Sequence, residues 1–228
     1  MLSIAICLLL QDSPFPLAEG NEWTYKETWS DSGNVRKSVE KKKFIEELKA
    51  VGVGYPRFPY LVPEGKETVT FKAGAKGALV ITYEEGISIE LTYDVNKEGI
   101  ALASKTISVD SDIVVTNAIK KAETFIKTPL KKGDTWKYGQ FDVKTGDEEE
   151  IEVKAGKFKC TKIVYTNTQP NPIGKCNIIG NPNTIELWVS PGTGIVKQVW
   201  ETHWGVGATG GVISQKRELQ TFKNAGKK

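Results

Sequence analysis

The segment Pro16-Leu17-Ala18-Glu19-Gly20-Asn21-Glu22-Trp23-Thr24-Tyr25 decides the fold, because its pattern occurs twice in the chain. The second copy reads Pro129-Leu130-Lys131-Lys132-Gly133-Asp134-Thr135-Trp136-Lys137-Tyr138, so Pro, Leu, Gly, Trp and Tyr all recur 113 residues later. Proline interrupts strand pairing, glycine permits a tight turn, and the Trp-x-Tyr pair then lies on one face of a new strand. The repeat therefore predicts a fold built by duplication.

Strand patterns follow both copies of the motif. Residues 87–95 alternate apolar and polar side chains, which is typical of a half-buried antiparallel strand. We expect further strands at 78–83, 151–153, 158–165, 185–189, 195–200 and about 212–222. Residues 37–51 and 112–126 fit either helices or extended structure, so at most one or two short helices are expected. The sequence thus predicts a mainly β, antiparallel fold made of two β-rich halves, 14–126 and 127–228.

The first thirteen residues resemble an N-terminal leader. An apolar run up to Leu10 is followed by polar residues at 11–13, which fits a signal peptide and is too short to span a bilayer. A buried N-terminal strand is the alternative. If the leader is removed, Cys160 and Cys176 remain, either as a disulfide or as two buried thiols. We therefore expect a periplasmic or secreted protein with no membrane span.

Composition excludes other classes of protein. The chain of 228 residues is 39% hydrophobic, which is too apolar for a disordered protein. Its net charge of +3 comes without a concentrated basic patch, since Lys41, Lys42 and Lys43 lie among glutamates. Nucleic-acid binders gather basic residues on one face or segment. No nucleic-acid partner is expected.

The candidate catalytic motifs are weak. Residues 205–210 spell G-x-G-x-x-G, but only a strand-like tail follows, so a glycine-rich hairpin fits better than a dinucleotide site. His203 is the only histidine, and period 2 places it with Glu201, opposite Trp200, Thr202 and Trp204. A pair of carboxylates for glycoside hydrolysis stays open, although nothing singles out two of the acids. We expect no enzyme activity, no cofactor and no metal.

Aromatic residues are the better candidates for a ligand site. Tyr55, Phe58 and Tyr60 lie in one short stretch with two prolines. Stiff rings on irregular backbone can contact a ligand at low entropic cost, or they can fold over the end of a barrel as a plug. Trp200 and Trp204 can line a concave sheet face or belong to the core. We take these five residues as candidate ligand-binding residues.

Three phrases carry a resemblance to a known group of proteins. They are Pro129–Trp136, Val153–Lys162 and Trp188–Lys197. They resemble uncharacterised exported bacterial proteins related to the LolA-like lipoprotein-carrier superfamily, best over 127–200. The resemblance implies a strongly curved antiparallel sheet, an incomplete barrel whose concave side some relatives use for acyl chains. It brings no catalytic residues.

These observations lead to three functional hypotheses. The first is a non-enzymatic exported protein that binds an apolar ligand, a lipid or acyl chain, in the hollow of a curved sheet. The second is an interaction or scaffold module of the cell envelope that holds a protein partner through sheet edges or the proline-aromatic stretch. The third is an enzyme such as a glycan hydrolase.

Overall fold

The computed structural model of the protein describes residues 15–31, 68–83, 87–96, 98–109, 112–169, 183–206 and 209–226. The strands of the first half are β1 (Glu22–Asp31), β2 (Thr68–Ala73), β3 (Ala78–Tyr83), β4 (Ile87–Asn96), β5 (Gly99–Val109) and β6 (Asp112–Lys127). Those of the second half are β7 (Thr135–Tyr138), β8 (Phe141–Val153), β9 (Gly156–Asn167), β10 (Thr184–Ser190), β11 (Gly194–Val206) and β12 (Thr209–Lys223).

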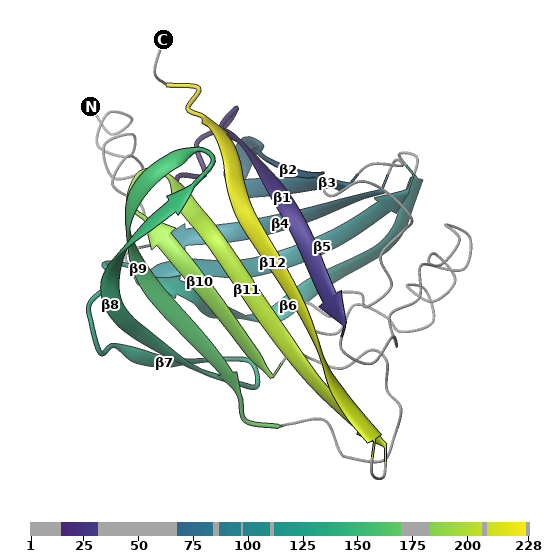
Figure 1. Ribbon diagram of the computed structural model, residues 1–228. Coiled ribbons are helices and arrows are strands. Elements are labelled where there is room, and N and C mark those ends of the chain that lie inside the picture. Colours follow the sequence, from purple (N-terminus) through teal and green to yellow (C-terminus); the bar gives the residue numbers. More distant parts are fainter. Residues whose placement is uncertain are drawn as a thin grey trace.

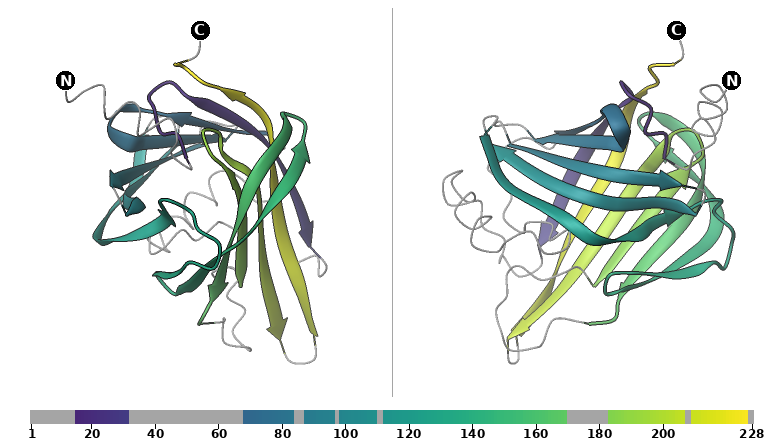
Figure 2. Two further views of the ribbon diagram at one scale, coloured as in Figure 1. Left: turned by 90° about the vertical axis from the view of Figure 1, so that its left-hand side faces the viewer. Right: turned by 180° about the vertical axis from the view of Figure 1, so that it is seen from behind.

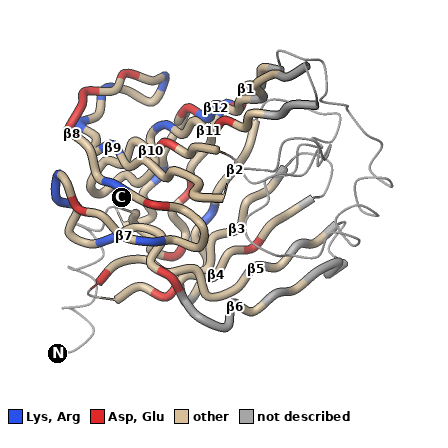
Figure 3. Tube along the Cα trace, turned by 90° about the horizontal axis from the view of Figure 1, so that it is seen from below, with Lys and Arg blue, Asp and Glu red and all other residues tan. Residues whose placement is uncertain are grey.

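All these strands form one curved antiparallel sheet in the order β6-β5-β4-β3-β2-β1-β12-β11-β10-β9-β8-β7. Each half is a meander of consecutive strands, and the halves join where β1 pairs with β12 (Figure 1). Viewed from below, the strands follow a nearly closed ring in which β6 and β7 are the two edges (Figure 3). The mainly β, incomplete-barrel fold is therefore confirmed.

The structure settles one of the two regions whose sequence fits either a helix or a strand. Residues 112–126 are extended, because they belong to β6. Residues 37–51 lie outside the described part of the chain. Within that part, the helical element is a short 3-10 turn, η1 (Ala75–Gly77), between β2 and β3.

The two copies of the sequence motif form the same pair of backbone hydrogen bonds. Gly20 N–H donates to the Ala73 carbonyl at 2.9 Å, and Gly133 N–H donates to the Thr145 carbonyl at 2.9 Å. In return, the amide of Ala73 donates to Asn21 O and that of Thr145 to Asp134 O, at 2.8 and 2.9 Å. Both glycines have left-handed φ values, 88° and 83°. The same ten-residue motif thus builds the same turn in each half, and β1 and β7 begin 113 residues apart.

Short connections close one end of the sheet, which we call the capped end. The turns β4–β5, β8–β9 and β10–β11 lie there, and Phe15 and Leu17 are buried there before β1 begins. Phe15 stacks on Trp23 at 5.2 Å between ring centroids. The tip of the β8–β9 hairpin folds inward, because the amide of Ala155 donates to Leu219 O at 3.3 Å. The capped end is therefore densely packed.

We call the opposite end of the sheet the loop end. Because the strands alternate in direction, β1 ends and β2 begins at this end, and β9 ends and β10 begins there as well. Figure 2 shows the strands diverging toward this end from two further directions.

The core fills the sheet interior between the halves. Trp23 is fully buried, and its indole N–H donates to Thr193 O at 2.6 Å. Tyr25 donates its hydroxyl to Ile195 O at 2.7 Å. These two aromatic residues of the first half therefore bind the turn and the start of β11 in the second half. Both their apolar burial and their hydrogen bonds stabilise this contact between the halves.

Side chains hold the seam between β6 and β7. Trp136 donates its indole N–H to Thr124 O at 2.8 Å, and Tyr165 donates its hydroxyl to Phe125 O at 2.6 Å. Lys127 Nζ reaches Thr135 O at 3.1 Å. In the described residues no backbone ladder joins these two strands, although they occupy the positions that β12 and β1 take at the other junction.

Glycine substitutions test the turn that connects β10 to β11. Gly194 has φ +95°, and an added Cβ there would lie 2.4 Å from Cδ2 of Phe15. We expect Gly194→Ala to lower the free energy of unfolding by about 2–5 kcal/mol, since left-handed strain adds to a ring clash. Gly133→Ala is the matched control: its φ is +83°, but nothing lies within 4 Å of the added atom, so about 1–2 kcal/mol is expected. Urea unfolding measures both, and equal losses would contradict this packing.

Candidate functional site

A cluster of buried polar side chains lies on the inner face of β1, β11 and β12. On β1, Trp23 and Tyr25 belong to the core, and strand alternation places Glu27 on the same face. The same alternation continues from Leu219 to Arg217 and Gln215 on β12, and from Trp200 to Gln198 and Thr202 on β11. The inner polar cluster comprises Glu27, Gln198, Thr202, Gln215 and Arg217, each at most 6% exposed.

An ion pair stands at the centre of this cluster. Arg217 Nε donates to Glu27 Oε2 at 2.6 Å, and these side chains are 3% and 5% exposed. The two residues lie directly opposite each other in the β1–β12 ladder. The Arg217 guanidinium also lies over the Phe71 ring, 5.6 Å from its centroid. Since burying charges in this way is costly, the pair is weak evidence for stability and a better indication of a specific role.

Amides and a tryptophan extend the cluster toward the loop end. Trp200 is 1% exposed and donates its indole N–H to Oε1 of Gln215. Gln198 lies opposite Arg217 in the β11–β12 ladder and is 6% exposed. Thr202 is the next inner residue of β11 after Trp200 and is also buried. Hydrogen-bonding groups thus replace the apolar side chains that occupy the inner face nearer the capped end.

Tyr25 forms the border between the core and the cluster. Burial raises the pKa of its phenol well above the ordinary value, and the nearby Arg217 charge offsets only part of that rise. The hydroxyl therefore stays protonated and donates to Ile195 O. Its contribution is structural positioning of β1 against β11.

The structure places the predicted aromatic site residues as follows. Trp200 lies on the inner face, as period 2 predicted, and it is hydrogen-bonded to Gln215. The backbone of Trp204 pairs with Gly211 two residue pairs from the end of β11, and its side chain lies outside the described part. Tyr55, Phe58 and Tyr60 also lie outside the described residues. The assignment of these residues to ligand binding stays a prediction.

Two other sequence interpretations agree with the structure. His203 is exposed while Thr202 is buried, so the predicted alternation along this stretch of β11 is confirmed. Gly205 pairs with Gly210, and Val206 with Thr209, so the G-x-G-x-x-G letters join two antiparallel strands. That hairpin replaces the helix that a dinucleotide site requires.

Sequence reasoning missed Glu27, Arg217 and Gln198. The signal was available, because Glu27 follows Trp23 and Tyr25 at period 2, and Gln198 precedes Trp200 at the same period. A charged residue on the core-facing side of an otherwise apolar strand is unusual enough to mark a paired or functional position. The identity of its partner required the β1–β12 pairing, which joins residues 190 positions apart.

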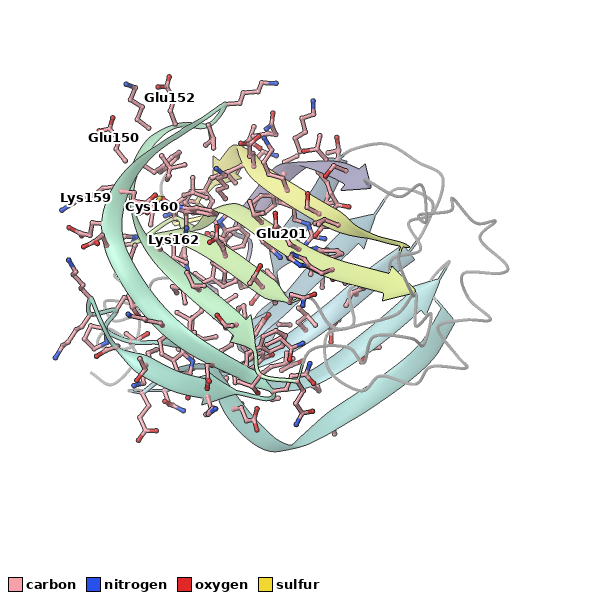
Figure 4. All side chains as sticks on the ribbon, turned by 60° about the horizontal axis from the view of Figure 1, so that its bottom comes forward. Glu150, Glu152, Lys159, Cys160, Lys162 and Glu201 are labelled. Atoms are coloured by element: carbon pink, nitrogen blue, oxygen red, sulfur yellow. The ribbon has the colours of Figure 1, made fainter. Side chains whose placement is uncertain are left out.

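The outer face carries a second, smaller apolar cluster. It consists of Cys160, Trp188 and Val196. Trp188 donates its indole N–H to Oε2 of Glu149 at 3.0 Å, and Lys162 and Lys197 lie 4.8 and 4.6 Å from its ring. Figure 4 shows Glu150, Glu152 and Lys159 pointing away from the curled β8–β9 hairpin. These residues form a solvated, charge-paired surface around a buried thiol.

Among the described residues, no group of three His, Cys, Asp or Glu side chains is arranged to hold a metal ion. No helix in the described ranges has the length and apolar character needed to cross a bilayer. The single carboxylate of the inner polar cluster is bound by Arg217.

Substitution of the buried ion pair gives a test of its energetics. Arg217→Met or Glu27→Met alone leaves one buried charge without its partner, so each is expected to cost about 3–5 kcal/mol of unfolding free energy. The double variant removes both charges and should cost less than either single variant. Urea unfolding of the four proteins measures this coupling, and additive losses would show that the pair does not interact.

Thiol reactivity gives a second test. Burial raises the pKa of the Cys160 thiol to about 12, and the Glu149 carboxylate adds to the rise. Because the thiolate is the reactive form, we expect iodoacetamide at pH 8 to label Cys160 at least tenfold more slowly in the folded protein than in urea. Peptide mass spectrometry measures labelling at this residue, and also detects any disulfide to Cys176. Equal rates in both states would contradict the burial.

Comparison with known proteins finds only distant likenesses. No protein-family model matches the sequence, and no curated protein matches it significantly. One similar structure is a predicted exported protein with a YmcC-like fold from Bacteroides fragilis NCTC 9343. It shows 13% identity, a TM-score of 0.35, and coverage of 92% of this chain and 98% of that one. Another is a predicted lipoprotein from Parabacteroides distasonis ATCC 8503, at 15% identity, TM-score 0.28, and coverage of 93% and 99%. The resemblance to the LolA-like superfamily stays a prediction.

Proposed function

We propose that this is a non-catalytic, exported protein that binds a lipid or acyl chain on the inner face of its curved sheet, near the loop end. The main support for the proposal is the change from apolar to polar side chains along this face. Toward the capped end the inner positions are apolar and packed, as at Trp23, Tyr25 and Leu219. Toward the loop end they become Glu27, Arg217, Gln198 and Thr202.

Such a change in lining matches an amphipathic ligand. Sites for small molecules combine apolar walls with a few placed polar groups that fix orientation. A protein that needed only stability would gain more from apolar side chains at these inner positions than from a buried ion pair. The polar residues are therefore best explained by something that they contact.

The same geometry supports a binding role over catalysis. Hydrolysis of a glycosidic bond requires two carboxyl groups about 5–9.5 Å apart. In the described part of the sheet interior, Glu27 is the carboxylate of the cluster, and its hydrogen bond to Arg217 occupies one of its oxygens. A group held this way positions other groups more readily than it transfers protons.

A titration with cis-parinaric acid tests the proposal on the delipidated protein. We expect saturable binding with a dissociation constant in the micromolar range or below, and energy transfer from tryptophan to the probe. Mass spectrometry of lipids that copurify with the untreated protein provides an independent readout. Absence of saturable binding, together with no copurifying lipid, would overturn the proposal.

Two adjacent substitutions locate the site on the inner face. Thr202→Trp places a large ring on the inner face beside Trp200, and His203→Trp places the same ring on the exposed face. We expect the first to weaken probe binding at least tenfold and the second to change it less than twofold. Circular dichroism and thermal unfolding confirm that both variants are folded. Equal effects would contradict an inner site.

A further inference from the structure

Among the described residues, one buried side-chain polar atom has no hydrogen-bond partner: the hydroxyl oxygen of Thr145. Thr145 lies on β8 and is 1% exposed. Along the strand it alternates with Phe141 and Val143, which both belong to the core, so its side chain lies on the inner face of the sheet. Because buried hydroxyls are normally satisfied, this one calls for an explanation.

The internal repeat shows that the turn before β7 does not need this hydroxyl. Thr145 and Ala73 form the same two backbone hydrogen bonds with the motif residues of their halves, Gly133–Asp134 and Gly20–Asn21. Ala73 therefore takes the position of Thr145 in the first half, and it is also 1% exposed. One copy of the turn has only a methyl group where the other has a hydroxyl without a partner. The hydroxyl thus serves something other than the turn.

The backbone of β8 is irregular directly after Thr145. The register of the β8–β9 ladder shifts between Thr145 and Glu148, so Gly146 and Asp147 lie opposite a single residue, Lys162. Such a bulge bends the strand and re-aims its side chains, and bulges are frequent beside binding sites. The regular ladder therefore ends at the residue whose hydroxyl lacks a partner.

The ladder neighbours of Thr145 offer its hydroxyl no partner. Ile163 lies opposite it on β9 and Leu187 follows on β10, and both side chains are buried and apolar. Gln198 of the inner polar cluster lies opposite Leu187 on β11. Three strand spacings therefore separate it from Thr145, roughly 14 Å along the sheet. A chain that follows this row meets polar groups at one end and, after an apolar stretch, one further hydroxyl.

We propose that Thr145 is a specificity-determining residue that binds a single uncharged oxygen, a hydroxyl or a carbonyl, on the acyl chain of the ligand. This inference rests on the proposed lipid-binding function. The head group lies at the inner polar cluster, and the chain passes Leu187 and Ile163 to reach Thr145. An uncharged oxygen accepts a hydrogen bond from the threonine, whereas the two apolar neighbours would leave a charged group without a counter-charge.

Two probes of one chain length test this inference. 12-Hydroxystearate carries a hydroxyl beyond the middle of its chain, and stearate lacks it. Competition with cis-parinaric acid on the full chain gives both dissociation constants, and their ratio cancels the effects that the probes share. Thr145→Val keeps the size of the side chain and removes its hydroxyl. We expect this variant to lower the preference for 12-hydroxystearate over stearate about three- to tenfold, the range of one hydrogen bond, and to change stearate binding less than twofold.

Three further variants serve as controls. Thr145→Ser keeps a hydroxyl at this position and should retain the preference for 12-hydroxystearate. Thr145→Ala copies the residue that the first half has in the same turn, and it should lose the preference as Thr145→Val does. Thr166→Val, at an exposed position of β9, is the matched control and should change neither affinity. Thermal unfolding monitors the folding of every variant.

The outcomes separate this inference from the proposed function. If both probes bind saturably and Thr145→Val leaves the ratio of their dissociation constants unchanged, the inference is wrong while lipid binding stands. The same conclusion follows if Thr145→Val raises the unfolding temperature without changing this ratio, because the hydroxyl is then only an unsatisfied group of the core. If neither probe binds saturably to the wild-type protein, the proposed function itself fails.

Discussion

The antiparallel ladder between β1 and β12 is the constraint on which the other features depend. It joins the first strand of one half to the last strand of the other, from Glu22 opposite Lys223 to Asp31 opposite Ile213. Without it, no backbone ladder among the described residues would join the two meanders. The same ladder places Glu27 against Arg217, so the pairing that closes the fold also creates its one described buried charge pair on the inner face.

At the second junction, between β6 and β7, the described residues form no such ladder. β7 has the position in its half that β1 has in the first half, but it turns into β8 after Tyr138. Trp136 and Tyr165 donate to β6 carbonyls instead. In the other direction, Lys127 of β6 donates to the Thr135 carbonyl of β7. A strand edge without a ladder must satisfy its backbone groups in another way, and here the side chains of Trp136 and Tyr165 supply donors while their rings pack on the core.

The sequence predicted the duplicated scaffold well because its evidence is local. The motif at Gly20 and Gly133 specifies the same turn twice, and alternation along residues 87–95 specifies β4. Residues 112–126 stayed ambiguous because Lys120, Lys121 and Ala122 are good helix formers, and pairing with β5 decided the outcome. The inner polar cluster was missed for a related reason, since Glu27 and Arg217 meet only through a ladder between opposite ends of the chain.

The polar groups divide the inner face of the sheet into two parts. Near the capped end, Trp23 and Tyr25 have both apolar burial and hydrogen-bond partners, so nothing further is needed to satisfy them. Further along the same face toward the loop end, the interior contains the Glu27–Arg217 ion pair, and Gln198 lies opposite Arg217. Because a buried ion pair stabilises a fold less than well-packed apolar side chains do, the capped end of the inner face contributes more to stability than the part nearer the loop end.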